Sequence, residues 1–296
     1  MGIVVNTNVP SLITQRNLNS ATNSLNQAME RMSTGSKINK AADDAAGLFV
    51  GITMDAQIRG SEQAQSNVQI GTNVLQKAEG DLTVIQDNIQ RIRDLAVQAS
   101  NEVYNDESLD AIKSEVYARM DEISRVANAS EFNGKKLFAK TGSITSLTFQ
   151  VGPNSTASEN AITISNIFGD MTASAGGLKL VAANGANFLK DDGTTSINAF
   201  SSSVADNQAF IATCDKALET IATKRSKIGS YQNRLSSANE SLTVSIENLS
   251  AAKSTIMDAD IAKESSNYVQ AQILQQAAAS LLTQANQAPS IALNLI

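Results

Sequence analysis

The 296-residue sequence contains no histidine and no tryptophan, one cysteine (Cys214) and only three prolines. Without histidine the chain lacks the commonest metal ligand and the commonest general base, so neither a Ser-His-Asp triad nor an HExxH zinc site can be built from it. A single cysteine excludes a disulfide within the chain. We therefore expect no enzyme activity, no metal and no cofactor.

Basic residues are also too few to form a nucleic-acid footprint. The net charge is −6 and the pI is about 4.8, so no basic stripe is available to displace counterions from phosphates. The N-terminus lacks the basic region and the cleavage site of a secretory signal. At the C-terminus, seven amide side chains between residues 270 and 287 interrupt the apolar residues that a membrane span would need. We expect neither nucleic-acid binding nor membrane insertion.

The second half of the sequence carries one long heptad repeat. No proline lies between about residues 205 and 256, so the segment can form one continuous helix. A helix with an apolar residue at every seventh position needs a partner helix to bury that row, as in a coiled coil. This row, the predicted rod seam, consists of Cys214, Ile221, Ile228, Leu235, Leu242, Leu249 and Ile256.

Partner helices are predicted in the first half. Two heptad rows there avoid all the charged residues between 75 and 99, and a third, shorter amphipathic segment follows. Three such seams predict a helical bundle. The rows are Leu75, Leu82, Ile89 and Ala96; Ala78, Ile85, Ile92 and Ala99; and Leu109, Ile112, Val116, Ile123 and Val126.

Between about residues 139 and 204 the pattern changes to Gly, Ser, Thr and Asn with short alternating runs. Residues 147–152 and 161–167 predict two strands of a β-hairpin, joined by a loop that contains a proline. Residues 171–204 carry turn signals at 176–177, 184–185 and 191–193. For this segment we expect a short exposed module or a long loop.

Both ends of the chain are helical in pattern and poor in charge, and residues 265–296 carry no charge at all. A core helix of the chain's own bundle is one explanation. The tail, however, is apolar or amide-bearing on nearly every side, whereas a surface helix of a monomer shows a charged face. This favours an assembly whose inner layer is built from the termini. The predicted core rows are Leu18, Leu25 and Met32, and Leu274, Ala278, Leu281 and Ala285.

Four collinear stretches, at residues 6–48, 90–101, 130–138 and 257–289, resemble bacterial flagellin, the filament subunit of the flagellum. The resemblance implies a mainly α-helical fold of a short form, with a small β-hairpin. It implies an inner domain of paired terminal helices (1–44 and 256–296), a discontinuous coiled-coil rod domain (45–170 and 205–255, hairpin about 147–167) and a reduced variable surface region (171–204).

The same resemblance implies a structural protein that self-assembles into the filament for swimming motility. It would leave the cell unfolded through the flagellar type III channel and act outside the cell. Its partners would be further copies of itself, the export chaperone, and the hook-junction and cap proteins. A host Toll-like receptor would recognise monomeric flagellin through a patch that Gln90, Arg91, Leu95 and Glu115 match.

Leu95 lies outside both heptad rows, so we expect it to pack against a neighbouring subunit, although it could instead widen the chain's own core. Acidic residues at helix boundaries are most simply caps for free backbone N–H groups, not metal ligands or an acid–base pair. This interpretation covers Asp43, Asp44, Asp258 and Asp260.

Three alternatives compete with a filament subunit. A hook–filament junction protein shares the helical ends, but residues 90–98 and 271–277 favour flagellin proper. A flagellin with a protease in its outer region would need an HExxH motif, which a chain without histidine cannot supply. A secreted coiled-coil adhesin is the third, and it would not form long uniform filaments.

Overall fold

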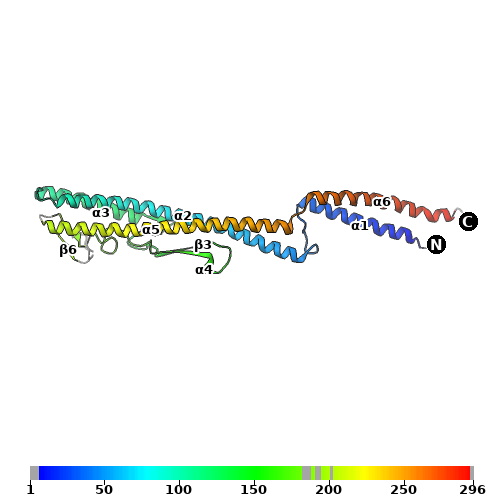
Figure 1. Cartoon of the computed structure of the whole chain (residues 1–296), viewed down its shortest axis with the longest axis horizontal. Coiled ribbons are helices and arrows are strands. Elements are labelled where there is room, and N and C mark those ends of the chain that lie inside the picture. Colours follow the sequence, from blue (N-terminus) through cyan, green and yellow to red (C-terminus); the bar gives the residue numbers. More distant parts are fainter. Residues whose placement is uncertain (1–6, 182–187, 191–194, 201–202, 294–296) are drawn as a thin grey trace. The chain divides into compact units, whose positions relative to one another are not determined.

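The computed structural model describes residues 7–181, 188–190, 195–200 and 203–293, the last six without their side chains. The chain divides into two compact units (Figure 1). The terminal unit comprises the residues up to 58 and from 247 onward, and the central unit comprises residues 59–246. This division falls inside two long helices, whereas the predicted domain boundaries at 44 and 256 fall near helix ends. The predicted domain assignment stays a prediction.

The chain is mainly helical, as predicted. The helices are α1 (Val9–Thr34), α2 (Ala45–Ala99), α3 (Asp106–Ala129), α4 (Ala157–Asn160), α5 (Val204–Met257) and α6 (Ile261–Leu293). The strands are β1 (Glu131–Phe132), β2 (Lys135–Lys136), β3 (Ser146–Gln150), β4 (Ala161–Ser165), β5 (Phe188–Leu189) and β6 (Ser196–Ile197).

The heptad rows form the core of the central unit. Every residue of both α2 rows is buried, and α3 contributes Leu109, Ile112, Val116 and Ile123. On α5 the seam is buried from Cys214 to Leu242, while Leu249 and Ile256, which belong to the terminal unit, are only half-buried. The predicted bundle of three helices is confirmed.

Polar contacts at the edge of this core show that α2 and α5 are antiparallel. Arg93 Nε donates to Asp215 Oδ1 at 2.6 Å, and Arg225 Nη1 donates to Gln86 Oε1 at 2.7 Å. Residues later in α2 therefore contact residues earlier in α5. Both pairs lie at the rim, so they contribute less to stability than the apolar seam that they flank.

The predicted β-hairpin is confirmed as β3 and β4, which pair antiparallel with Ser146 opposite Ser165 and Gln150 opposite Ala161. The connection contains α4. The hairpin lies against α2, where a Cβ atom at Gly60 would come within 2.8 Å of the Pro153 side chain. A residue without a side chain is needed for this close approach.

The described part of residues 171–204 is not exposed throughout, as an exposed module would be, and most of it is loop, which was the alternative prediction. Of the described part, the buried residues include Met171, Leu178, Leu180, Phe188 and Phe200. The Phe188 ring stacks on Tyr117 of α3 at 5.2 Å and meets Phe210 of α5 edge-on at 4.9 Å. The prediction of exposure rested on the many turn-forming residues of the segment. Its few apolar side chains nevertheless bury enough surface to hold the segment against the helices. The turn signals at 184–185 and 191–193 lie outside the described residues.

One buried amide holds the end of this segment. Asn207, which is 1% exposed, accepts a hydrogen bond from the Phe200 backbone N–H at 2.6 Å. Its Nδ2 donates to the Ala99 carbonyl, at the last residue of α2, at 2.9 Å. The side chain of Asn207 thus joins α2, α5 and residues 195–200.

Asn207→Ala is expected to lower the free energy of unfolding by about 2–4 kcal/mol, because it leaves a backbone donor and a backbone acceptor buried without partners. Urea denaturation followed by circular dichroism measures this change. Asn239→Ala is the control, since Asn239 is exposed on the same helix and its loss should change stability by less than about 0.5 kcal/mol. Equal effects of the two substitutions would contradict the role of Asn207.

In the terminal unit, acidic side chains cap backbone N–H groups as predicted. Asp44 Oδ1 accepts from the N–H groups of Ala46 and Gly47 at the start of α2, and Asp260 does the same for Ala262 and Lys263 at the start of α6. Asp43 accepts from the Asn39 and Lys40 N–H groups, which lowers the pKa of its carboxyl. Asp258 instead forms a backbone bridge with Ser36.

Candidate functional site

The first and last helices, α1 and α6, lie side by side as an antiparallel pair with a narrow seam (Figure 1). Among the residues of the two helices whose side chains are described, the buried apolar ones are Ala21, Ala28, Ala271 and Ala278. Side chains this small let two helices approach closely but bury little area. The predicted residues Leu18, Leu25, Met32 and Ala285 are half-buried.

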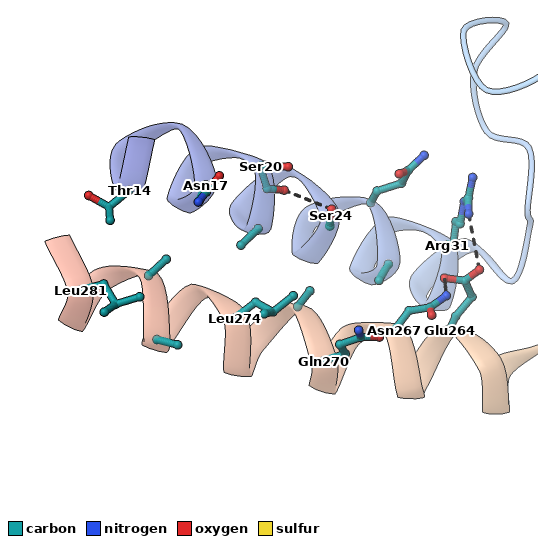
Figure 2. A pocket seen from close by; sticks show the side chains of 16 residues that line it. Thr14, Asn17, Ser20, Ser24, Arg31, Glu264, Asn267, Gln270, Leu274 and Leu281 are labelled. Carbon is teal, nitrogen blue, oxygen red and sulfur yellow. Dashed lines mark hydrogen bonds and ion pairs between the residues drawn. The ribbon is translucent and has the colours of Figure 1, made fainter. Parts of the chain in front are cut away.

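A groove with a volume of about 620 Å³ runs along this pair (Figure 2). Leu274 and Leu281 line it from α6, and Thr14, Asn17 and Ser20 line it from α1. The two leucines are 53% and 52% exposed, so they do not belong to the seam within one chain. The seam positions of α6 are Tyr268, Ala271, Gln275, Ala278, Leu282 and Ala285.

One end of the groove is charged. Arg31 Nη1 lies 3.4 Å from Glu264 Oε1, and Glu264 Oε2 accepts from Asn267 Nδ2 at 3.3 Å (Figure 2). Glu264 is only 8% exposed, and the buried Arg31 Nε has no hydrogen-bond partner among the described residues. The remaining residues that line the groove are uncharged. The sequence did not predict this pair. Its signal was the position of Glu264, which is the last charged residue of the chain.

Large apolar side chains are exposed on the outer sides of the same two helices. Each of these residues is between 45% and 59% exposed. A concentration of exposed apolar side chains on one helix pair is typical of a surface that another molecule covers. They are Val9, Leu12, Ile13 and Met29 on α1, and Ile261, Val269, Ile273, Leu274 and Leu281 on α6.

The four residues of the predicted receptor patch differ in exposure. Gln90 and Arg91 are exposed on α2, and Arg91 Nε donates to Glu115 Oε1 of α3 at 3.0 Å, which raises the pKa of Arg91. Leu95 is 2% exposed and belongs to the core of the central unit. Of the two alternatives for Leu95, this burial favours the chain's own core over a contact with a neighbouring subunit. Leu95 widens this core because α3 covers this side of α2.

Within the described residues, no group of three or more His, Cys, Asp or Glu side chains could hold a metal ion. Over the same residues, every helix is too short or too polar to span a membrane. Cys214 is buried in the core of the central unit, and burial raises the pKa of its thiol.

Comparison with known proteins agrees with this architecture. Residues 5–143 match the family model of the bacterial flagellin N-terminal helical region, and residues 211–296 match that of the bacterial flagellin C-terminal helical region. Flagellin of Bacillus subtilis is 38% identical over 312 aligned residues, which cover 99% of each chain. The flagellar filament 33 kDa core protein of Treponema phagedenis is 38% identical over 302 aligned residues, which cover 99% of this chain and all of the relative.

A solved structure of a candidate flagellar hook-associated protein from Vibrio parahaemolyticus has the same fold. Its TM-score is 0.56 at 17% identity, over 73% of this chain and all of that one. At this identity the likeness concerns the fold alone. The full-length matches to flagellins and the two terminal helical regions show that the chain belongs to the bacterial flagellin family.

Proposed function

We propose that this protein is the structural subunit of a bacterial flagellar filament and that it polymerises through α1 and α6. The observation that carries the proposal is the surface of this helix pair. It carries few charges, its described part exposes nine large apolar side chains, and the apolar residues that are fully buried in its seam are alanines. Such a pair buries little within one chain and gains most of its stability when copies cover it.

Family membership supports the rest of the proposal. The subunit would pass unfolded through the flagellar type III channel with the help of an export chaperone, and it would assemble outside the cell for swimming motility. Hook-junction and cap proteins would bound the filament at its two ends. The exposed residues Gln90 and Arg91 and the half-buried Glu115 would contribute to recognition of the monomer by a Toll-like receptor, with Leu95 supporting them from the core.

Seeded polymerisation tests the proposal. Purified protein added to short filament fragments should elongate them into long uniform filaments that electron microscopy resolves. A hook–filament junction protein would add to an end and stop, and a coiled-coil adhesin would not elongate the seeds. Either of these outcomes would reject the filament-subunit proposal.

Limited proteolysis should distinguish the two units in the free monomer. We expect rapid trimming within α1 and α6, because a helix pair that buries only alanines and a few half-buried residues is marginal in water. The central unit should persist as a stable fragment. Mass spectrometry of the fragments measures this, with assembled filaments as the control, in which both ends should be protected. Equal resistance of the ends and the centre in the monomer would contradict the idea that assembly orders the termini.

A further inference from the structure

The two connections of the terminal unit, between α1 and α2 and between α5 and α6, pair with each other through their backbones. We call this pairing the junction. Its contacts are Lys37 N–H to the Met257 carbonyl at 2.6 Å, Ala259 N–H to the Gly35 carbonyl at 2.9 Å, and the antiparallel bridge between Ser36 and Asp258. Hydrogen bonds of this length require close approach, so the junction persists only while the helix ends that carry it stay in place.

One side chain at the junction is a methionine thioether. Met257 is the last residue of α5, and its side chain lies on Gly51, a buried residue of α2. A Cβ atom at Gly51 would come within 2.6 Å of Met257 Sδ and 2.9 Å of Met257 Cγ. The missing side chain of Gly51 is therefore what lets the thioether rest directly on the helix. Met257 thus supplies a main-chain acceptor and an apolar contact at the same place.

The Met257 side chain is within reach of small solutes. It is half-buried, whereas Met120 and Met171 are buried in the core of the central unit. Hydrogen peroxide oxidises a thioether to a sulfoxide without help from other residues. A sulfur lone pair forms the S–O bond as the O–O bond breaks, and the departing hydroxide takes the proton of the transferred oxygen and leaves as water. The sulfur is oxidised and the peroxide is reduced.

A sulfoxide fits this place poorly. Its oxygen is a strong hydrogen-bond acceptor, which is unfavourable to bury without a donor. The backbone N–H groups inside a helix are already bonded, so Gly51 offers the oxygen no donor. Keeping the oxygen in water moves the side chain off Gly51, and the end of α5 moves with it. We propose that Met257 is a peroxide-sensitive modification site whose oxidation opens the junction.

The other methionines described in the terminal unit provide the comparison. Met29, Met32 and Met54 take no part in the backbone hydrogen bonds of the junction. Met29 is 48% exposed on α1, so its sulfoxide remains in water. Oxidation of Met29 should therefore leave the junction closed, which makes Met29 the matched control.

Hydrogen exchange on the full-length monomer tests the proposal. The chain is treated with hydrogen peroxide, the excess is removed with catalase, and peptide mass spectrometry locates each added oxygen. Exchange is then followed at the Lys37 and Ala259 amides, which are the donors of the junction. We expect slow exchange before oxidation, and exchange about tenfold faster or more once Met257 is oxidised. Methionine sulfoxide reductases of both epimer specificities should restore the slow exchange.

Three variants assign the effect to one sulfur. Met257→Leu keeps the apolar contact, so exchange should stay slow with and without peroxide. Met29→Leu should behave as the parent chain does. Met257→Gln places a permanent amide at the site and should exchange quickly without any oxidant. If Met257→Leu already exchanges quickly before treatment, reversal by the reductases in the parent chain decides.

Seeded elongation adds a functional measurement that rests on the proposed function. The oxidised parent chain should elongate seeds less well than the oxidised Met257→Leu variant. Failure of the untreated parent to elongate seeds would reject the filament-subunit proposal, whereas the exchange measurement on the monomer is independent of it.

Four results would overturn the inference about Met257. The first is a parent chain with fast exchange at both amides before oxidation. The second is a Met257 that resists peroxide while Met29 is oxidised. The third is unchanged exchange after Met257 is oxidised. The fourth is a Met257→Leu variant whose exchange starts slow and accelerates with peroxide as much as that of the parent chain.

Discussion

Leu281→Arg is expected to abolish polymerisation while the central unit stays folded. Leu281 is 52% exposed in the single chain and lines the groove between α1 and α6. If copies of the chain cover this groove in the filament, the arginine becomes buried without a partner, at a cost of several kcal/mol in each subunit. The same change repeats in every subunit along the filament. Elongation of seeds, followed by sedimentation and electron microscopy, measures the effect, and circular dichroism monitors the fold.

Asn198→Arg is the matched control for this experiment. Asn198 is exposed in the central unit, so a charge there remains in water and filaments should form normally. Arginine at Thr194, in the segment that the sequence predicted to be an exposed module or a long loop, would be a similar control, but this residue lies outside the described residues. Filaments of normal length and yield from Leu281→Arg would show that the groove stays open in the assembly, and the proposed polymerisation surface would then be wrong.

Leu95→Ala should produce the second large effect, and it should be visible in the monomer. Leu95 is 2% exposed among the core residues of the central unit, so its truncation removes buried methyl groups and leaves a cavity. We expect the free energy of unfolding to fall by about 2–5 kcal/mol. Thermal and urea denaturation of the unassembled protein measure this loss. A substitution at a contact between subunits would instead leave the monomer's stability unchanged.

Arg91→Ala separates stability from recognition at the same place on α2. Arg91 is exposed and its ion pair with Glu115 is solvated, so the monomer's melting should change little. Signalling by a Toll-like receptor should nevertheless fall if the proposed patch is correct. A strong stability loss from Arg91→Ala, or full signalling by that variant, would contradict the assignment. An unchanged melting curve for Leu95→Ala would contradict the burial of Leu95.

The two units illustrate two ways of stabilising long helices. The central unit buries continuous rows of Leu and Ile between α2, α3 and α5, and each such side chain contributes about 1.5–3 kcal/mol before the entropy of ordering is subtracted. The terminal unit joins its helices through alanines and one ion pair, so its apolar gain within one chain is small. The same physical difference underlies both the proposed polymerisation and the expected fraying of the monomer.

Periodic elements were predictable from the sequence. The seam from Cys214 to Leu242, both rows of α2 and the row of α3 all repeat at helical spacing, and burial follows directly from that period. The hairpin of β3 and β4 was predictable because alternating strands flank a turn. Capping by Asp44 and Asp260 followed from their positions before helices. These features depend on neighbours along the chain, so a single sequence contains the information.

Contacts between distant segments were not predictable in this way. The burial of Leu95 depends on how α3 covers α2, and the burial of Phe188 and Phe200 depends on an aromatic cluster assembled from three parts of the chain. The choice of seam on α6 is a further case. Leu274 and Leu281 have the same helical spacing as Ala278 and Ala285. The two leucines are nevertheless exposed in the groove, whereas Ala278 is buried.

The amino-acid sequence by itself therefore determined the helical bundle, the hairpin, the helix caps and the absence of charge from residues 265–296. Only the tertiary structure decided which face of α6 meets α1, that Arg31 and Glu264 come together, and that Leu95 belongs to the core. The physical reason is the range of the interactions. Helical period and capping act within about one turn, whereas the pairing of faces depends on how separate helices fit together in space.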